Sequence, residues 1–195
     1  MELERAQLIS REIAGILAPA CRRIELAGSV RRGKPDVHDV EFVFEPKLGL
    51  RAVDLFESET YPLTDDVLAT LQEAGTLASD DKVKRWGPKY KRCVHVASGL
   101  VIELFAADSE NWGYILALRT GPYDFNKVLV RQPWHGGALP LGVRLVDGYV
   151  YRDGCRLPVP TEEDFFTALN LPCWPPAERS EGRILAHLAA REARL

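Results

Sequence analysis

Hydrophobic and polar residues alternate in two ways along this chain, and each way predicts a different kind of element. Apolar residues within positions 3–17 recur at helical spacing, which predicts an amphipathic helix over residues 3–18 that ends at Pro19. Short apolar runs then predict strands at about 23–27 and 38–44. We expect these two strands to pair as neighbours and to hold the turn between them.

The rest of the chain predicts a mixture of helices and strands. Residues 46–62 have no clear period and are interpreted as a connection. The elements expected after it are a helix from Thr64 to Gly75, a hairpin or meander over 77–96 with its turn near Gly87-Pro88, a strand over 101–105, a helix over 111–118, a helix that starts at Pro122, a hairpin over 142–151 around Asp147-Gly148, a capped helix from Thr161 and a charged helix over 181–195. This mixture predicts an α+β fold, with a mixed or antiparallel sheet flanked by helices.

Composition and charge narrow the class of protein. With 195 residues, 46% of them hydrophobic, we expect one domain, or one domain with a small subdomain. No run of about 18 apolar residues occurs, so no membrane span is expected, and the charged first residues do not resemble a signal peptide. The four cysteines form no Cys-x-x-Cys pair, which predicts reduced thiols in a cytoplasmic protein rather than zinc ligands or disulfides. The net charge of −3 is unfavourable for binding nucleic acid, but an acidic metal site and a local basic surface would cancel in this sum.

The most informative stretch is AGSVRRGKPDVHDVEF, residues 27–42. In a strand, residues two apart share a face, so Asp39 and Glu41 point the same way while Val40 and Phe42 face the core. Two carboxylates about 7 Å apart at the backbone repel each other unless a cation lies between them. Mg²⁺ meets this demand, because it prefers one or two carboxylates together with substrate phosphates.

The same stretch also offers ligands for phosphate. The Gly28-Ser29 turn offers backbone N–H groups and a hydroxyl, and Arg32 offers a bidentate guanidinium. Taken alone, the acidic pair is also typical of a solvated strand, and the arginines are also typical of an ordinary basic loop. The combination of these features at this spacing is far more restrictive than either one.

Two later segments carry further candidate chemistry. Residues 82–92, KVKRWGPKYKR, contain no acid and have Trp86 and Tyr90 interleaved among their basic residues, which are Lys82, Lys84, Arg85, Lys89, Lys91 and Arg92. They are interpreted either as a solvated hairpin or as an edge that follows a phosphate backbone. Glu103 lies in the apolar run 101–105, where an acid is costly unless it is paired, metal-bound or at an edge that faces water.

These residues carry a resemblance to a known family. A small apolar residue, Gly-Ser, nine residues and then Asp-apolar-Glu-apolar resembles the signature of the nucleotidyltransferase superfamily. With Arg31-Arg32-Gly33 inside it, the stretch most resembles the family X DNA polymerases, the polymerase beta group. A second match is Thr120-Gly121 followed by Phe125-Asn126, which is similar to the nucleotide-binding turn of that group. The resemblance covers roughly residues 23–179.

The resemblance implies a fold and a set of site residues. It implies a polymerase beta-like palm over 1–108 and a small thumb-like, nucleotide-binding α+β subdomain over 109–195, without the lyase segment of larger members. It implies that Asp39, Glu41 and Glu103 are catalytic and bind two Mg²⁺ ions, for which Mn²⁺ can substitute. The other implied contacts are Gly28, Ser29, Arg32 and His38 for the triphosphate, Thr120, Gly121, Phe125 and Asn126 for base and sugar, and the basic residues of 82–92 for the nucleic-acid backbone. Arg31 is expected to be a structural or surface partner, and the Gly121-Pro122 bond is expected to be cis, as in the family.

The implied activity is transfer of a nucleotide from an NTP or dNTP to the 3′-hydroxyl of a primer, with release of pyrophosphate, in repair-type gap filling or end extension. The expected partners are the triphosphate and a primer–template or single-stranded nucleic acid, DNA above all, and the expected state is a monomer. The sequence departs from the family at Glu41 and Glu103, which replace aspartates, at Leu118-Arg119, which replaces an aromatic pair, and at His38, which replaces glycine. Two alternatives stay open: a nucleotidyltransferase with a small-molecule or protein acceptor, and an inactive nucleotide-binding module.

Overall fold

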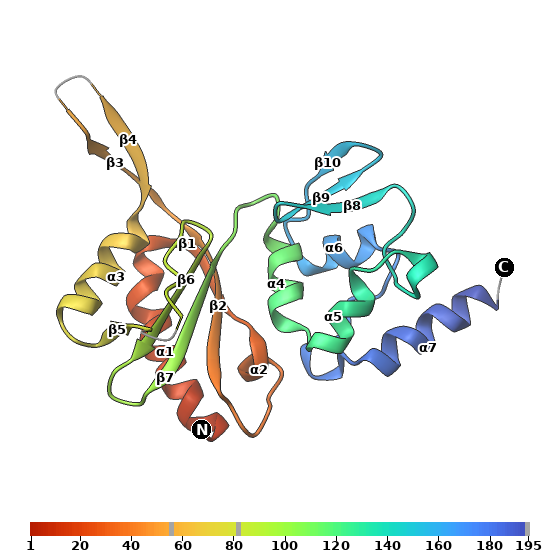
Figure 1. The fold of residues 1–195 in the computed structure, drawn as a ribbon, viewed down its shortest axis with the longest axis horizontal. Coiled ribbons are helices and arrows are strands. Elements are labelled where there is room, and N and C mark those ends of the chain that lie inside the picture. The colour runs from red at the N-terminus through yellow and green to blue at the C-terminus, as the bar shows by residue number, and fades with distance from the viewer. Residues whose placement is uncertain (55–56, 81–82, 194–195) are drawn as a thin grey trace. The chain divides into compact units, whose positions relative to one another are not determined.

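A computed structural model describes residues 1–54, 57–80 and 83–193 of the protein (Figure 1). The chain forms two compact units. Unit 1 comprises Met1–Val30 and Lys34–Asp108, and unit 2 comprises Arg31–Gly33 and Ser109–Leu195. Each unit has its own hydrophobic core.

Unit 1 is built on a mixed sheet with the strand order β1-β2-β7-β6-β5. Its strands are β1 (Cys21–Leu26), β2 (Asp39–Pro46), β5 (Leu77–Ser79), β6 (Tyr90–His95) and β7 (Leu100–Ala106). β2 and β7 run parallel, and the other neighbouring strands run antiparallel. The predicted pairing of the first two strands is confirmed, and so is the α+β class with a mixed sheet and flanking helices.

Helices α1 (Leu3–Leu17) and α3 (Leu63–Glu73) lie on one face of this sheet, as Figure 1 shows. The apolar side of α1 packs with alternate residues of the central strands, and Ile13, Phe42 and Ile102 are all completely buried. Burial of such a side chain contributes about 1.5–3 kcal/mol. This packing decides which face of β2 and β7 becomes core, and it sends the intervening residues to the other face.

The segment expected to be a connection instead contains a hairpin, β3 (Leu48–Ala52) paired with β4 (Ser58–Pro62). The sequence pattern missed it because most of its residues are exposed, so no alternation between a buried and a solvated face is present. Arg51 and Glu59, directly opposite each other in the pairing, form an ion pair of 2.6 Å across the strands.

Unit 2 packs helices against a small antiparallel sheet with the order β10-β9-β8. Its elements are α4 (Trp112–Thr120), α5 (Tyr123–Leu129), β8 (Val143–Val146), β9 (Tyr149–Arg152), β10 (Cys155–Leu157), α6 (Glu162–Ala168) and α7 (Glu181–Glu192). The predicted hairpin is confirmed, with positive φ at both Asp147 and Gly148. The predicted cap of α6 is confirmed too, as a capping box between Thr161 and Asp164.

Short connecting elements complete the two units. α2 (Gly28–Arg31) follows β1, and 3₁₀ turns occur at Ala18–Ala20, Pro133–His135 and Pro176–Glu178.

The prediction of a cis Gly121-Pro122 bond is wrong, because no cis peptide bond occurs among the described residues. Gly121 is extended, with φ −68° and ψ 146°, and its N–H donates to the carbonyl oxygen of Ala117 at 2.9 Å. The amide of Asn126 donates to the carbonyl oxygens of Leu118 and Gly121 at 2.6 and 3.0 Å. These hydrogen bonds close the turn between α4 and α5 with the trans bond.

Candidate functional site

The strand register of unit 1 places three carboxylates on one face of the sheet. Asp39 and Glu41 are two residues apart on β2, and Glu103 lies directly opposite Glu41 on the parallel strand β7. Directly opposed residues of neighbouring strands point to the same face. Because Val40 and Ile102 face the core with α1, Asp39, Glu41 and Glu103 share the opposite face, as the sequence predicted for the first two.

Glu103 is held by two side chains from β6. The hydroxyl of Tyr90 and Nη1 of Arg92 both donate to its Oε1, each at 2.5 Å. Burial raises the pKa of Tyr90, and its hydrogen bond to the Glu103 carboxylate raises it further. Nε of Arg92 also donates to Oδ2 of Asp80 at 2.6 Å, so this guanidinium bridges two carboxylates. In this conformation a cation of the protein itself neutralises Glu103.

The carboxylates of this face are hard oxygen donors of the kind that a divalent metal ion such as Mg²⁺ binds. Over the residues that the structure describes, no three His, Cys, Asp or Glu side chains are grouped to hold one ion. Asp39 and Glu41 nevertheless supply the carboxylate pair that Mg²⁺ takes together with substrate phosphates. The chemistry of these two residues fits the ion, but ligation by any of the three carboxylates stays a prediction. For Glu103 it requires that Oε1 leave Arg92.

The Gly28-Ser29 turn lies against this carboxylate pair. Gly28 has φ +61°, and a Cβ atom at this position would collide with Oε2 of Glu41. Glycine is therefore required both by the left-handed backbone and by the closeness of the carboxylate. The N–H of Ala27 donates to the carbonyl oxygen of Glu41 at 2.8 Å and holds the turn to β2.

The hydroxyl of Ser29 is buried in this turn and is a candidate for binding a ligand. Its Oγ is buried, and it has no hydrogen-bond partner among the described residues. A buried polar atom without a partner costs free energy, so such atoms are candidates for binding a ligand. An acceptor oxygen of a phosphate would satisfy it.

The paired arginines, Arg31 and Arg32, both bind residues of unit 2. Arg31 donates to Oγ1 of Thr120 and to Oε2 of Glu162, each at 2.7 Å, and Arg179 donates to Oε1 of Glu162 at the same distance. Arg32 donates to the carbonyl oxygen of Thr120 at 2.6 Å. These contacts agree with the expectation that Arg31 is a structural or surface partner.

Glu162 is the partner that Arg31 and Arg179 share, and the sequence did not reveal it. Glu162 is one acid in the run Glu162-Glu163-Asp164 at the start of a helix, where acids are common without any partner. Burial would raise the pKa of Glu162, but the hydrogen bonds from Arg31 and Arg179 outweigh it, and the pKa lies below its usual range.

The predicted base and sugar contacts lie in the turn of unit 2. Thr120 and Phe125 are completely buried, and Phe125 packs against Phe166 and Trp174. Asn126 holds the turn through its amide nitrogen, while its Oδ1 is buried without a partner among the described residues. Asn126 is the member of this set whose side chain keeps an unused polar atom.

His38, a predicted triphosphate contact, is largely exposed to solvent. Its side chain is 86% exposed, and Nε2 lies 3.5 Å from Oδ2 of Asp36. The pKa of Asp36 is lowered, first by its hydrogen bond with the terminal ammonium of Met1.

The basic residues of the segment 82–92 separate into two groups. Lys82 lies outside the described residues. Lys91 is only 4% exposed, and it pairs with Asp65 of α3 at 3.2 Å and donates to the carbonyl oxygen of Gly87. This burial argues against the predicted backbone contact of Lys91, and Arg92 is engaged with Asp80 and Glu103. The exposed cations of this segment are Lys84, Arg85 and Lys89.

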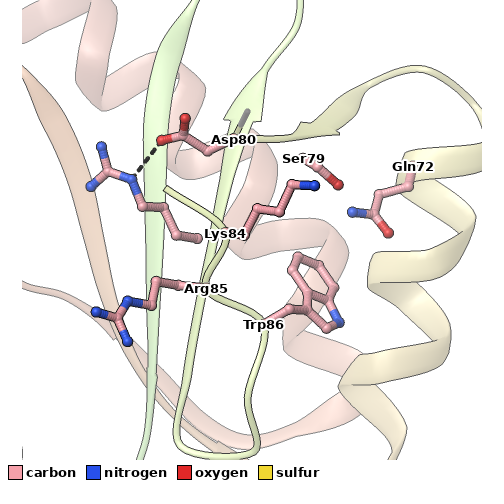
Figure 2. Close-up of a pocket in the computed structure, with 7 residues that line it drawn as sticks. Gln72, Ser79, Asp80, Lys84, Arg85 and Trp86 are labelled. Atoms are coloured by element: carbon pink, nitrogen blue, oxygen red, sulfur yellow. Dashed lines mark hydrogen bonds and ion pairs between the residues drawn. The ribbon is translucent and has the colours of Figure 1, made fainter. Parts of the chain in front are cut away.

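A cavity of about 700 Å³ opens beside this segment (Figure 2). Its lining residues are Gln72, Ser79, Asp80, Lys84, Arg85, Trp86 and Arg92. A second hollow of about 480 Å³ shares Lys84, Arg85 and Trp86 and extends to Tyr90.

Comparison with known proteins does not place the chain in a family. It matches no protein-family model, and no curated protein is similar enough to be a relative. Within the described residues, no helix is both long and apolar enough to cross a membrane.

Proposed function

We propose that this protein is a metal-dependent nucleotidyltransferase of the polymerase beta type, with a palm-like unit 1. It transfers a nucleotide from a nucleoside triphosphate to the 3′-hydroxyl of a nucleic-acid primer, in repair-type gap filling or end extension. The observation that supports it best is the carboxylate face: Asp39, Glu41 and Glu103 in register on β2 and β7, with the Gly28 turn in contact with Glu41.

Mg²⁺ is the cofactor that this donor set fits, with Asp39 and Glu41 as its protein ligands. When bound, a pair of such ions activates an attacking hydroxyl and neutralises the leaving pyrophosphate. The support for this assignment is chemical, because Asp39 and Glu41 share one face and Mg²⁺ prefers one or two carboxylates together with substrate phosphates.

Three other side chains of unit 1 have separate roles near those carboxylates: binding phosphate, accepting a proton and orienting the proton acceptor. The Ser29 hydroxyl donates to a phosphate oxygen, which satisfies its buried Oγ. Glu103 accepts the proton of the primer hydroxyl after its Oε1 leaves Arg92. Tyr90 keeps the Glu103 side chain oriented through its own hydrogen bond during this change.

The residues of unit 2 bind the nucleotide. The guanidinium of Arg32 is suited to a bidentate contact with the β- and γ-phosphates. In this structure the amide of Asn126 donates to the carbonyl oxygens of Leu118 and Gly121. When a nucleotide binds, the amide can instead donate to an acceptor on the minor-groove edge of a base pair. Minor-groove acceptors are shared by all base pairs, so this contact does not select a sequence.

The experiment that tests the proposal is extension of a labelled primer, alone and on a gapped duplex, with each deoxy- and ribonucleotide and with Mg²⁺ or Mn²⁺. We expect extension by the wild type and none by Asp39→Asn, whose folding is preserved because the substitution relieves repulsion on the carboxylate face. Glu12→Gln, an exposed change on α1, serves as the control and should keep wild-type activity. Extension by Asp39→Asn at the wild-type rate would contradict the proposal.

The ion pair between Arg92 and Glu103 favours one alternative, an inactive nucleotide-binding module in which the protein cation permanently replaces a metal. Calorimetric titration separates the two. The enzyme is expected to bind triphosphate more tightly when Mn²⁺ is present, whereas the module need not respond to the metal. If triphosphate binds with metal but no primer is extended, a panel of small-molecule and protein acceptors is the next test.

A further inference from the structure

The edge of the unit 1 sheet beside β6 is occupied by two separate stretches of chain. β5 pairs with the far end of β6, where Ser79 lies opposite Cys93. The chain returns to this edge at Arg85, whose carbonyl oxygen accepts from the N–H of Arg92 at 2.8 Å, and at Gly87, whose N–H donates to Tyr90 at 2.8 Å. The cavity of about 700 Å³ is lined by residues of both stretches, so it lies where the paired edge is interrupted.

In the returning stretch, residues 84–86, successive side chains point to opposite sides of the sheet edge (Figure 2). Figure 2 shows Lys84 and Trp86 directed toward Gln72 on α3, and Arg85 directed to the opposite side. This alternation is the one expected of an extended segment, and Trp86 forms an isolated antiparallel bridge with Lys91. The cavity therefore offers an indole and an ammonium together on one side and a guanidinium on the other.

The side chain of Trp86 is held in place but remains partly accessible to solvent. The backbone of Trp86 pairs with Lys91 of β6, and the ammonium of the buried Lys91 lies 5.9 Å from the centroid of the indole ring. The side chain is nevertheless 46% exposed, and it lines two hollows. A fixed, half-exposed indole loses little conformational entropy when another ring stacks on it.

The charges around the indole favour an anion. Lys84 and Arg85 are exposed, and neither forms an ion pair with another described residue. Asp80, the one acid among the described residues that line the cavity, is paired with Arg92 at 2.6 Å. Among the described residues, the cavity thus presents the ammonium of Lys84 on the side of the indole and the guanidinium of Arg85 on the other side, and neither is in an ion pair (Figure 2). Cations near an exposed aromatic ring are the chemistry that binds the phosphates and bases of a single strand.

We propose that this cavity binds a nucleotide of a single-stranded nucleic acid, with its base stacked on Trp86, its phosphate held by Lys84 and a neighbouring phosphate of the same strand held by Arg85. A paired base is already stacked inside its duplex, so only an unpaired base reaches the indole. The proposal deepens the proposed function, since the strand bound here would be an unpaired part of the acceptor, but this binding needs neither metal nor triphosphate.

The first test is titration of intrinsic tryptophan fluorescence in EDTA, with oligothymidylate and oligouridylate of about eight nucleotides. We expect quenching, and we expect Trp86→Leu to abolish most of it and to weaken binding roughly 5- to 150-fold, the range for loss of one stacked base. Trp134→Leu is the matched control, since Trp134 is 66% exposed but belongs to unit 2. Trp86→Phe keeps a stacking ring and should bind within a few-fold of the wild type.

A second test uses charge and does not depend on the folding of the Trp86 variants. Lys84→Gln and Arg85→Gln should each weaken binding and lower the slope of log affinity against log salt by about 0.7–1. Arg11→Gln, an exposed change on α1, should leave the slope unchanged. Quenching by either polymer supports the site and shows which strand it accepts, and blunt duplex should not quench.

Quenching by neither polymer, or equal binding by the wild type, Trp86→Leu and the two charge variants, would overturn the site. These readouts are separate from primer extension. A protein that binds single strands through Trp86 but extends no primer would refute the polymerase activity and keep the site. A protein that extends primers with unchanged affinity after Trp86→Leu would refute the site and keep the activity.

Discussion

Arg92 lies directly opposite Glu103 in the antiparallel pairing of β6 with β7, and its Nη1 donates to Oε1 of that carboxylate at 2.5 Å. The other end of the guanidinium donates to Asp80, a bond that is the main cause of the raised pKa of Arg92. Because the guanidinium stays charged, Glu103 is neutralised without any metal. Access of a divalent ion to Glu103 therefore competes with Arg92.

Arg92→Gln tests this competition. Removal of the guanidinium leaves the carboxylate face more negative, so we expect Mn²⁺ to bind several-fold more tightly, as measured by calorimetry. Without metal, we expect the free energy of unfolding to fall by about 1–3 kcal/mol, because Asp80 and Glu103 lose a charged hydrogen-bond partner. Arg23→Gln, which breaks the 2.8 Å pair with Glu45 elsewhere on this sheet, is the control. Unchanged or weaker Mn²⁺ binding by Arg92→Gln would show that no competition exists.

Gly28→Ala tests the contact between the turn and the carboxylate pair. Gly75→Ala is the matched control, since Gly75 has φ +70° and nothing lies within 4 Å of an added Cβ. Both changes place alanine in the left-handed region, at a cost of about 1–2 kcal/mol. Only Gly28→Ala also displaces Glu41, so we expect metal binding and primer extension to be lost in this variant and kept in the control. Equal activity of the two variants would remove the turn from the site.

Arg32→Ala tests the phosphate contact. A charge-assisted hydrogen bond to phosphate contributes about 1.5–3 kcal/mol, so we expect the KM for triphosphate to rise by an order of magnitude or more. Lys34→Ala, an exposed cation two positions later, should leave KM within about twofold. Steady-state kinetics with varied triphosphate measure both, and a wild-type KM in Arg32→Ala would exclude Arg32 from triphosphate binding.

Glu162→Gln tests the buried network of unit 2. The folded-state pKa of Glu162 lies below its ordinary value of 4.5, so its stabilising contribution is present above that pH and is lost as the pH falls through the folded-state pKa. At pH 7 we expect the substitution to lower the free energy of unfolding by about 3–5 kcal/mol, because Arg31 and Arg179 lose a buried partner. The difference from the wild type should shrink as the pH falls below 4.5.

Urea unfolding at several pH values makes this measurement. Glu163→Gln, its exposed neighbour on the same helix, should change the stability little at any of them. A difference between the wild type and Glu162→Gln that is constant from pH 7 to pH 3 would contradict the assigned coupling.

Local pattern alone was enough for most elements of this protein. Helical spacing in α1, alternation in β2 and the Asp147-Gly148 turn depend on residues near each other in sequence, and the structure confirms each of them. The same local logic placed Asp39 and Glu41 on one face, because the period of a strand requires it. The sequence did not predict the hairpin β3–β4, because both of its faces are largely exposed and no alternation of apolar and polar residues marks it.

Tertiary structure decided what those side chains contact. Lys91 and Arg92 belong to one basic run, yet pairing with Asp65 buries the first, and pairing with Glu103 brings the second to the carboxylate face. Sequence spacing determines the face on which a side chain lies, whereas its partner comes from another strand or helix, so a charge in the sequence does not reveal whether it is already neutralised.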